Sequence, residues 1–176
     1  MKKKKYGGGG SDLMEREIKY NSSIPASIQL LFNNQKLEIM KVLCLMNALS
    51  IQSNKQRKVE EILFYYSLVN FDLAYLFNNK LDTKNEFAPS PNQYFRFQTK
   101  INEILLIMSH LQFIEIKGKL SNRLDELKVK LSLPGKKFFE DNSSEYLNSL
   151  LKKYIEIYET IDYSAENVKK IKEGQF

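Results

Sequence analysis

Few side chains in this sequence could carry out catalysis. The 176 residues include one histidine, His110, and one cysteine, Cys44. Cys44 lies in the apolar segment Val42–Met46, which predicts a buried, inert thiol. A metal site would need a second histidine, cysteine or carboxylate at ligand spacing from His110, and a catalytic triad would need a nucleophile beside it. We therefore expect structural or surface roles for both residues, and neither a disulfide nor a metal site.

The sequence also lacks the glycine-rich patterns that bind nucleotides. Gly118 and Gly135 are isolated glycines that predict turns, and no phosphate-binding loop or dinucleotide fingerprint occurs. The carboxylate pairs Glu60–Glu61 and Asp125–Glu126 are adjacent in sequence, so we expect their side chains to diverge into solvent. The sequence therefore predicts a protein that is not an enzyme and needs no cofactor.

Basic side chains are the other group that could bind a ligand, in this instance the phosphates of duplex DNA. The candidates belong to a predicted helix and to the polar segment that follows it: Arg96, Lys100, Lys117, Lys119, Arg123, Lys128 and Lys130. Glu103, Asp125 and Glu126 lie on the same surfaces, and solvated strand faces are commonly rich in lysine. Weak binding of DNA without sequence preference and a merely solvated surface therefore both stay open.

The net charge of the whole chain exaggerates this basic character. The chain has 27 basic and 21 acidic residues, a formal +6, but Lys2–Lys5 supply four of the basic residues, and the rest carries only +2. Residues 1–11 join these lysines to Gly7–Gly10 and predict an added tail with a flexible linker, which we exclude from the fold. No segment has the apolar length of a membrane span or a secretion signal, which predicts a soluble, cytoplasmic protein with no membrane partner.

Four amphipathic segments predict the helices that position these residues. Apolar side chains recur at helical spacing over residues 35–50, 59–76, 93–111 and 143–162. The second segment is apolar on more than one face, so we expect it at the centre of the core. Two prolines predict a loop over residues 81–92, and Asn142 followed by Glu145 resembles a capping box that begins the last helix.

Two short strands follow the third helix. Residues 113–117 and 127–133 alternate apolar and polar side chains on either side of a polar loop, which predicts a β wing. These elements predict a mainly α-helical fold with a small β wing, a winged helix-turn-helix with an added C-terminal helix. We assign the domain to residues 12–162, and residues 163–176 to a charged, frayed tail.

Two apolar and aromatic surfaces exceed what so small a core needs and predict a protein interface. One is the start of the 93–111 helix, with Tyr94 and Phe95. The other is a stripe along the last helix: Leu147, Leu150, Leu151, Tyr154, Tyr158 and Ile161. If this stripe is exposed, it would form a homodimer or bind another subunit. The alternative is that it packs back onto the core.

The layout resembles the middle-component subunits of bacterial ABC-three-component systems, the group that includes the third subunit of Lamassu-type antiphage defence. The resemblance rests on residues 37–49 (LEIMKVLCLMNAL), 55–71 (KQRKVEEILFYYSLVNF) and 129–139 (VKLSLPGKKFF), and it covers roughly residues 24–161. It implies a non-catalytic adaptor that bridges an SMC- or Rad50-like ATPase and an effector, often a nuclease, held inactive until phage DNA is sensed. Residues 129–135 are equally similar to MarR-like transcription regulators, so a DNA-binding winged-helix regulator is the alternative expectation.

Overall fold

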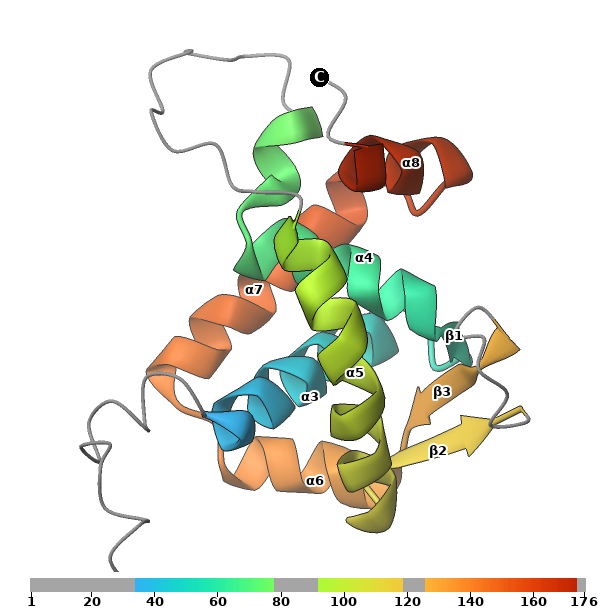
Figure 1. The fold of residues 1–176 in the computed structure, drawn as a ribbon. Coiled ribbons are helices and arrows are strands. Elements are labelled where there is room, and N and C mark those ends of the chain that lie inside the picture. Colours follow the sequence, from blue (N-terminus) through green and yellow to red (C-terminus); the bar gives the residue numbers. More distant parts are fainter. Residues whose placement is uncertain (1–33, 78–91, 119–125, 174–176) are drawn as a thin grey trace, which may run out of the picture. The chain divides into compact units, whose positions relative to one another are not determined.

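The computed structural model describes residues 34–77, 92–118 and 126–173. The chain divides into two compact units, residues 1–34 and 35–176, and apart from Asn34 all described residues belong to the second. The tail predicted over residues 1–11 and most of the loop predicted over residues 81–92 lie outside the described part. The elements of the second unit, drawn in Figure 1, are α3 (Gln35–Gln52), β1 (Arg57–Lys58), α4 (Val59–Asn70), the 3-10 helix η2 (Leu73–Phe77), α5 (Asn92–His110), β2 (Ile114–Lys117), β3 (Lys128–Leu131), α6 (Leu133–Asp141), α7 (Glu145–Thr160) and α8 (Ala165–Glu173).

Helices α3 and α4 form the centre of the core. Every residue from Val42 to Leu49 in α3 and from Ile62 to Leu68 in α4 is buried. A helix that is buried on all sides needs neighbours on all sides. Helix α7 packs against both, α5 packs on α4, and α6 packs on α3. The predictions of a mainly helical fold with a small sheet, and of a central helix beginning at Val59, are therefore confirmed.

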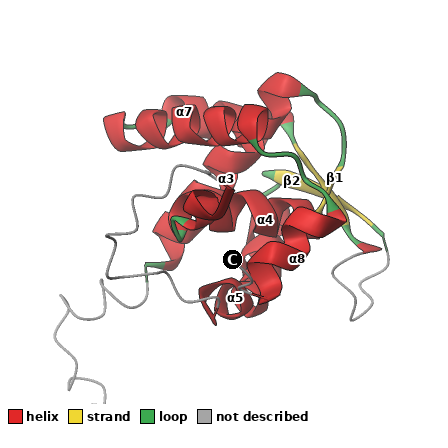
Figure 2. Ribbon diagram, turned by 90° about the horizontal axis from the view of Figure 1, so that it is seen from above, coloured by secondary structure: helices red, strands yellow, loops and turns green. Residues whose placement is uncertain are grey.

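The sheet has three antiparallel strands in the order β1-β3-β2, and Figure 2 shows it to one side of the helices. Strands β2 and β3 are the two that the alternating pattern predicts. Ile114 is opposite Leu131 and Ile116 is opposite Val129, so apolar partners share one face. The prediction was wrong at Leu133, which begins α6 instead of ending the strand. Sequence analysis missed β1, because two residues, Arg57 and Lys58, are too short to show an alternation.

The helix predicted over residues 59–76 is interrupted after Asn70. Asp72 adopts a positive φ of 57°, a conformation that aspartate tolerates better than most residues, and the short helix η2 follows. Phe71, at the point of interruption, has a ring that contacts the rings of Tyr66 and Phe97. Tyr66 and Phe97 themselves stack with ring centres 3.8 Å apart, which joins α4 to α5.

Helices α6 and α7 both begin at serine caps. The Ser132 hydroxyl accepts a hydrogen bond from the Gly135 N–H, and the Ser144 hydroxyl accepts one from the Leu147 N–H. The predicted cap at Asn142 is therefore wrong, because Asn142 ends α6 and Ser144 is two residues nearer to the helix that it caps. Gly135 lies against the backbone of Phe113 so closely that a Cβ atom there would be 2.2 Å from the Phe113 carbonyl oxygen.

The prediction of a frayed tail over residues 163–176 is also wrong for the residues that are described. Residues 165–173 form α8, which buries Val168 and Ile171. The Lys172 ammonium donates a hydrogen bond of 2.6 Å to Glu60 on α4, and the Tyr163 hydroxyl donates one of 2.9 Å to the same carboxylate. The tail was misread because two buried residues among many charged ones give a weak apolar pattern.

Among the described residues, no helix has both the length and the apolar character that crossing a membrane requires.

Candidate nucleic-acid interface

The exposed face of α5 carries two of the predicted DNA-contacting residues. Arg96 and Lys100 lie one helical turn apart and are both exposed. Glu103, one turn further on, accepts a hydrogen bond of 2.7 Å from Gln35 of α3. Phe95, whose exposed fraction is 45%, shares the start of this helix. The face is therefore mixed in charge and partly apolar, and it does not form a uniform basic stripe.

The outward face of the sheet carries the other described candidates. Lys117 and Lys128 are exposed and directly opposite each other, and Lys130 is half-buried opposite Glu115. On its other side Lys128 is opposite Lys58 of β1, which is also exposed. We call Lys58, Lys128 and Lys117 the lysine row. The candidates Lys119 and Arg123 lie outside the described residues.

Lys58 is a member of this surface that sequence analysis missed. Its neighbour Arg57 has the opposite orientation, with only 3% of its surface exposed. One signal was available, because a polar Arg-Lys pair directly before a strongly apolar helix must put one of its two side chains against the core. Without the third strand, however, nothing in the sequence indicates which one.

Arg57 is held at three points, and this fixes β1. Its guanidinium donates hydrogen bonds to the Glu61 carboxylate at 2.7 Å, to the Tyr158 hydroxyl at 3.2 Å and to the Leu49 carbonyl oxygen at 3.3 Å. Burial alone would lower the pKa of Arg57, but the bonds to Tyr158 and Glu61 outweigh it and leave the pKa raised. The arginine is therefore a charged link between α3, α4 and α7 at the base of the lysine row.

The pair Glu60–Glu61 does not diverge into solvent as predicted. The two side chains do point to different partners, but both are partly buried and both are paired, Glu61 with Arg57 and Glu60 with Lys172 and Tyr163. Burial would raise the pKa of Glu60, but the hydrogen bonds from Lys172 and Tyr163 outweigh it and hold the pKa below its ordinary value. Glu60 therefore links α4 to α8, and Glu61 links α4 to β1.

Most of the predicted protein interface belongs to the core of this chain. Five of its members are at most 7% exposed, which corrects their assignment to a surface: Tyr94, Leu147, Leu150, Tyr154 and Ile161. Leu151 and Tyr158 are half-buried, and Phe95 is exposed. The stripe predicted on the last helix lies along α7 and packs back onto α3 and α4, the alternative that the sequence left open. Helical periodicity cannot distinguish a core contact from a partner contact.

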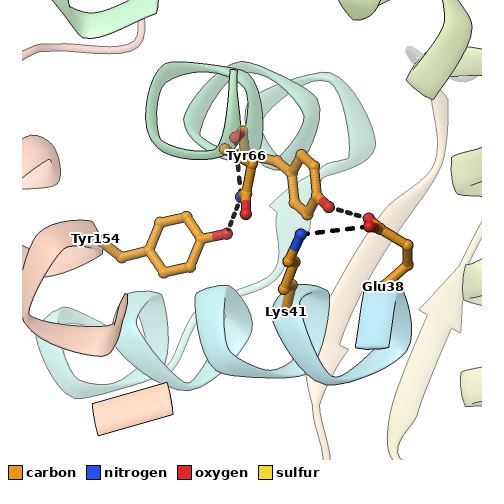
Figure 3. Close-up of polar contacts among 5 residues, drawn as sticks. Glu38, Lys41, Tyr66 and Tyr154 are labelled. Atoms are coloured by element: carbon orange, nitrogen blue, oxygen red, sulfur yellow. Dashed lines mark hydrogen bonds and ion pairs between the residues drawn. The ribbon is translucent and has the colours of Figure 1, made fainter. Parts of the chain in front are cut away.

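Polar groups within this contact fix α7 and α4 in place, as Figure 3 shows. The Tyr66 hydroxyl donates a hydrogen bond to Glu38, which also pairs with Lys41 at 3.3 Å. The Tyr154 hydroxyl accepts a hydrogen bond from the Asn70 side-chain amide. Burial and the neighbouring Glu38 raise the pKa of Tyr66, and burial raises the pKa of Tyr154, so both stay neutral. Buried hydroxyls satisfied in this way specify one packing arrangement.

Cys44 and His110, whose side-chain types can take part in catalysis, lie in different environments. Cys44 is fully buried, its thiol donates to the Leu147 carbonyl oxygen at 3.4 Å, and burial raises its pKa to about 12. A neutral thiol in that position is a poor nucleophile. His110 is exposed at the end of α5. Across the described ranges, no three histidine, cysteine or acidic side chains come together as a metal site would require.

Comparisons with protein-family models, with curated proteins and with solved structures found no match. The family resemblance drawn from the sequence is therefore still a prediction.

Proposed function

We propose that this chain is a winged-helix protein that acts as a non-catalytic adaptor subunit in a bacterial antiphage complex, bridging an SMC- or Rad50-like ATPase and a nuclease-type effector. The observation that carries the proposal is the order of elements from α3 to β3 when the short 3-10 helix η2 is set aside, namely helix, strand, helix, helix, strand, strand, with β1 and β2 on either side of β3. This order supports the proposal of a winged helix, in which α5 would take the position of the recognition helix.

The adaptor role draws its support from the family resemblance and from the surface near α6. Leu133 is 83% exposed at the start of α6, and Leu111 is 50% exposed in the turn after α5. The Ser132 hydroxyl donates a hydrogen bond of 2.6 Å to the Gln112 carbonyl oxygen, which holds these two segments against each other. We call Leu111 and Leu133 the α6 corner. Large exposed aliphatic side chains on a rigid corner suit a contact with another protein.

A co-expression experiment tests this role. The chain carrying Leu111→Glu and Leu133→Glu is co-expressed with the SMC- or Rad50-like ATPase that the proposal expects among the neighbouring genes, and the complex is captured through a tag on that ATPase. Loss of the chain from the captured complex is the expected result. Tyr146→Glu is the matched control, because Tyr146 is also an exposed large side chain, at 53%, but lies on α7. Equal capture of the corner variant and the control would contradict the proposed corner.

A DNA-binding transcription regulator is the second candidate. The observation that favours it is the exposed pair Arg96 and Lys100 on α5, in the position of a recognition helix. Phe95 and Glu103 on the same helix weaken it, since a groove-reading surface presents donors and cations to DNA. Weak binding of duplex DNA without sequence preference agrees with the adaptor. Tight binding to one operator, lost with Arg96→Ala or Lys100→Ala, would establish the regulator instead.

A further inference from the structure

We propose that the outward face of the sheet, centred on the lysine row, is the surface that binds the phosphate backbone of duplex DNA. The inference deepens the proposed contact with DNA and rests on it, but it does not depend on the adaptor role. It narrows the predicted contact, which also included Arg96 and Lys100 on α5, to the three strands, and it adds Lys58.

The register of the strands carries the argument. Lys58 is opposite Lys128, and Lys128 is opposite Lys117, so one lysine from each strand lies in a single line across the sheet. All three side chains are exposed. Residues directly opposite each other in an antiparallel pair have Cβ atoms about 5 Å apart on the same face, and adjacent strands lie about 4.8 Å apart. The row therefore places three positive charges along about 10 Å.

Such an arrangement is unfavourable for the protein alone. Like charges directly opposite each other destabilise a sheet, and Lys128 has a lysine on both sides. The strand partners on this face include one carboxylate, Glu115, which is opposite Lys130 and not opposite a member of the row. Glu60 is near Lys58, but it is already bonded to Lys172 and Tyr163. A polyanion would relieve this repulsion, since each lysine that neutralises a phosphate also releases a counterion.

The row is held on a rigid base. Arg57, on the buried face of β1, is bonded to Glu61, Tyr158 and Leu49. The Val59 N–H donates a hydrogen bond of 3.1 Å to the Leu127 carbonyl oxygen, which ties the end of β1 to the start of β3. A ligand that contacts the row therefore meets a surface whose backbone is already fixed.

The chemistry of this face favours duplex DNA over single-stranded nucleic acid and over an anionic membrane. Single-stranded nucleic acid is bound through aromatic side chains on which bases stack, and the outward strand residues here are lysines and one glutamate. An anionic membrane surface is held by basic residues together with apolar side chains that enter the lipid, and this row has none. Lysine binds phosphate as a point charge without bidentate geometry, which suits a contact that follows the backbone and reads no bases.

The test compares three variants of the full chain in binding to a labelled duplex of arbitrary sequence. The row variant is Lys58→Ala, Lys117→Ala and Lys128→Ala. The control is Lys36→Ala, Lys152→Ala and Lys153→Ala, which removes the same charge from exposed positions on α3 and α7. The third variant is Arg96→Ala with Lys100→Ala. Every variant keeps Lys2–Lys5, so any contribution from these residues cancels when the variants are compared with the unmodified chain.

The measured quantity is the slope of log affinity against log salt concentration. The row variant should lose roughly 0.9 of this slope for each lysine removed, and on the order of tenfold in affinity at low salt. The control and the α5 variant should stay close to the unmodified chain. Circular dichroism checks folding, and if the row variant unfolds, the single changes Lys58→Gln, Lys117→Gln and Lys128→Gln replace it, each with about one third of the effect.

Each alternative outcome identifies what is wrong. If the unmodified chain binds no duplex at low salt, both the DNA contact and the row are refuted. If it binds but the row variant matches the control, the row is refuted while the DNA contact stands. If the row governs binding to vesicles of anionic lipid and not to duplex DNA, the assignment of the partner is wrong.

Discussion

Gly135→Ala should destabilise the protein, although it adds only one methyl group. The added Cβ would lie 2.2 Å from the Phe113 carbonyl oxygen and 2.9 Å from the Phe113 carbonyl carbon and Cα. All three atoms are backbone, so no side chain can rotate away. Helix α6 would have to move roughly 1 Å or more from β2 to reach van der Waals distance. Such a shift would strain the hydrogen bonds from Ser132 to Phe113 and Gln112.

The size of the effect follows from these contacts. Overpacking costs about 1–3 kcal/mol, and each weakened hydrogen bond adds about 1 kcal/mol. The better helix propensity of alanine offsets at most about 1 kcal/mol of this cost. A net loss of about 2 kcal/mol lowers the melting temperature of a chain of this length by roughly 4–8 °C.

Thermal unfolding followed by circular dichroism measures this loss. Lys136→Ala is the control, because it places the same side chain at the next position, where the lysine is half exposed. Its stability should change by less than about 0.5 kcal/mol. If Gly135→Ala and Lys136→Ala melt at the same temperature, α6 does not pack on Phe113 as described.

Three further predictions concern the core, the lysine row and α8. Tyr154→Glu should lower the free energy of unfolding, measured in urea, by about 4 kcal/mol or more and unfold the protein, because it puts a carboxylate where 1% of the residue is exposed. The control Tyr154→Phe should cost about 1 kcal/mol. A folded Tyr154→Glu variant would show that the side chain is at the surface. Lys128→Glu should raise the free energy of unfolding by about 0.2–1 kcal/mol at low salt and by less at high salt, because it replaces two like-charge pairs with two opposite-charge pairs. A fall in melting temperature would contradict the strand register. The lowered pKa of Glu60 means that its contribution to stability is complete above its unfolded pKa of about 4.3 and is lost as pH falls through the lower folded value. The melting temperatures of Glu60→Gln and of the unmodified chain should therefore converge in acid and separate at neutral pH, and parallel curves over the whole range would refute the Lys172 contact.

Much of the fold could be predicted from the sequence, because long apolar periods and strict alternation are local signals. Helices α3, α5 and α7 begin and end within two residues of their predicted bounds. The features that were missed depend on contacts between distant segments. Strand β1 exists because Arg57 and Lys58 pair with β3, about 70 residues later, and α8 is held by Glu60. Such short elements have little preference of their own.

The same difference between local patterns and contacts of distant segments applies to the candidate site. Lys117, Lys128 and Lys130 were predicted as an outward face because alternation in a strand fixes which side chains point together. Tyr94 and Tyr154 were assigned to an interface because an apolar stripe indicates burial without indicating what covers it. In the structure α4 packs against α5 and α7, and α3 also packs against α7, so helices of the same chain cover these side chains.

The role proposed for this chain is that of a folded, non-catalytic subunit of a larger assembly. Native mass spectrometry of the chain co-expressed with the proteins encoded beside it tests this claim most directly. We expect a complex of fixed stoichiometry that contains the chain, a coiled-coil ATPase and an effector, and that survives at physiological salt. A chain that remains alone or self-associated in this experiment, and that binds a single operator tightly at the same salt, would contradict it.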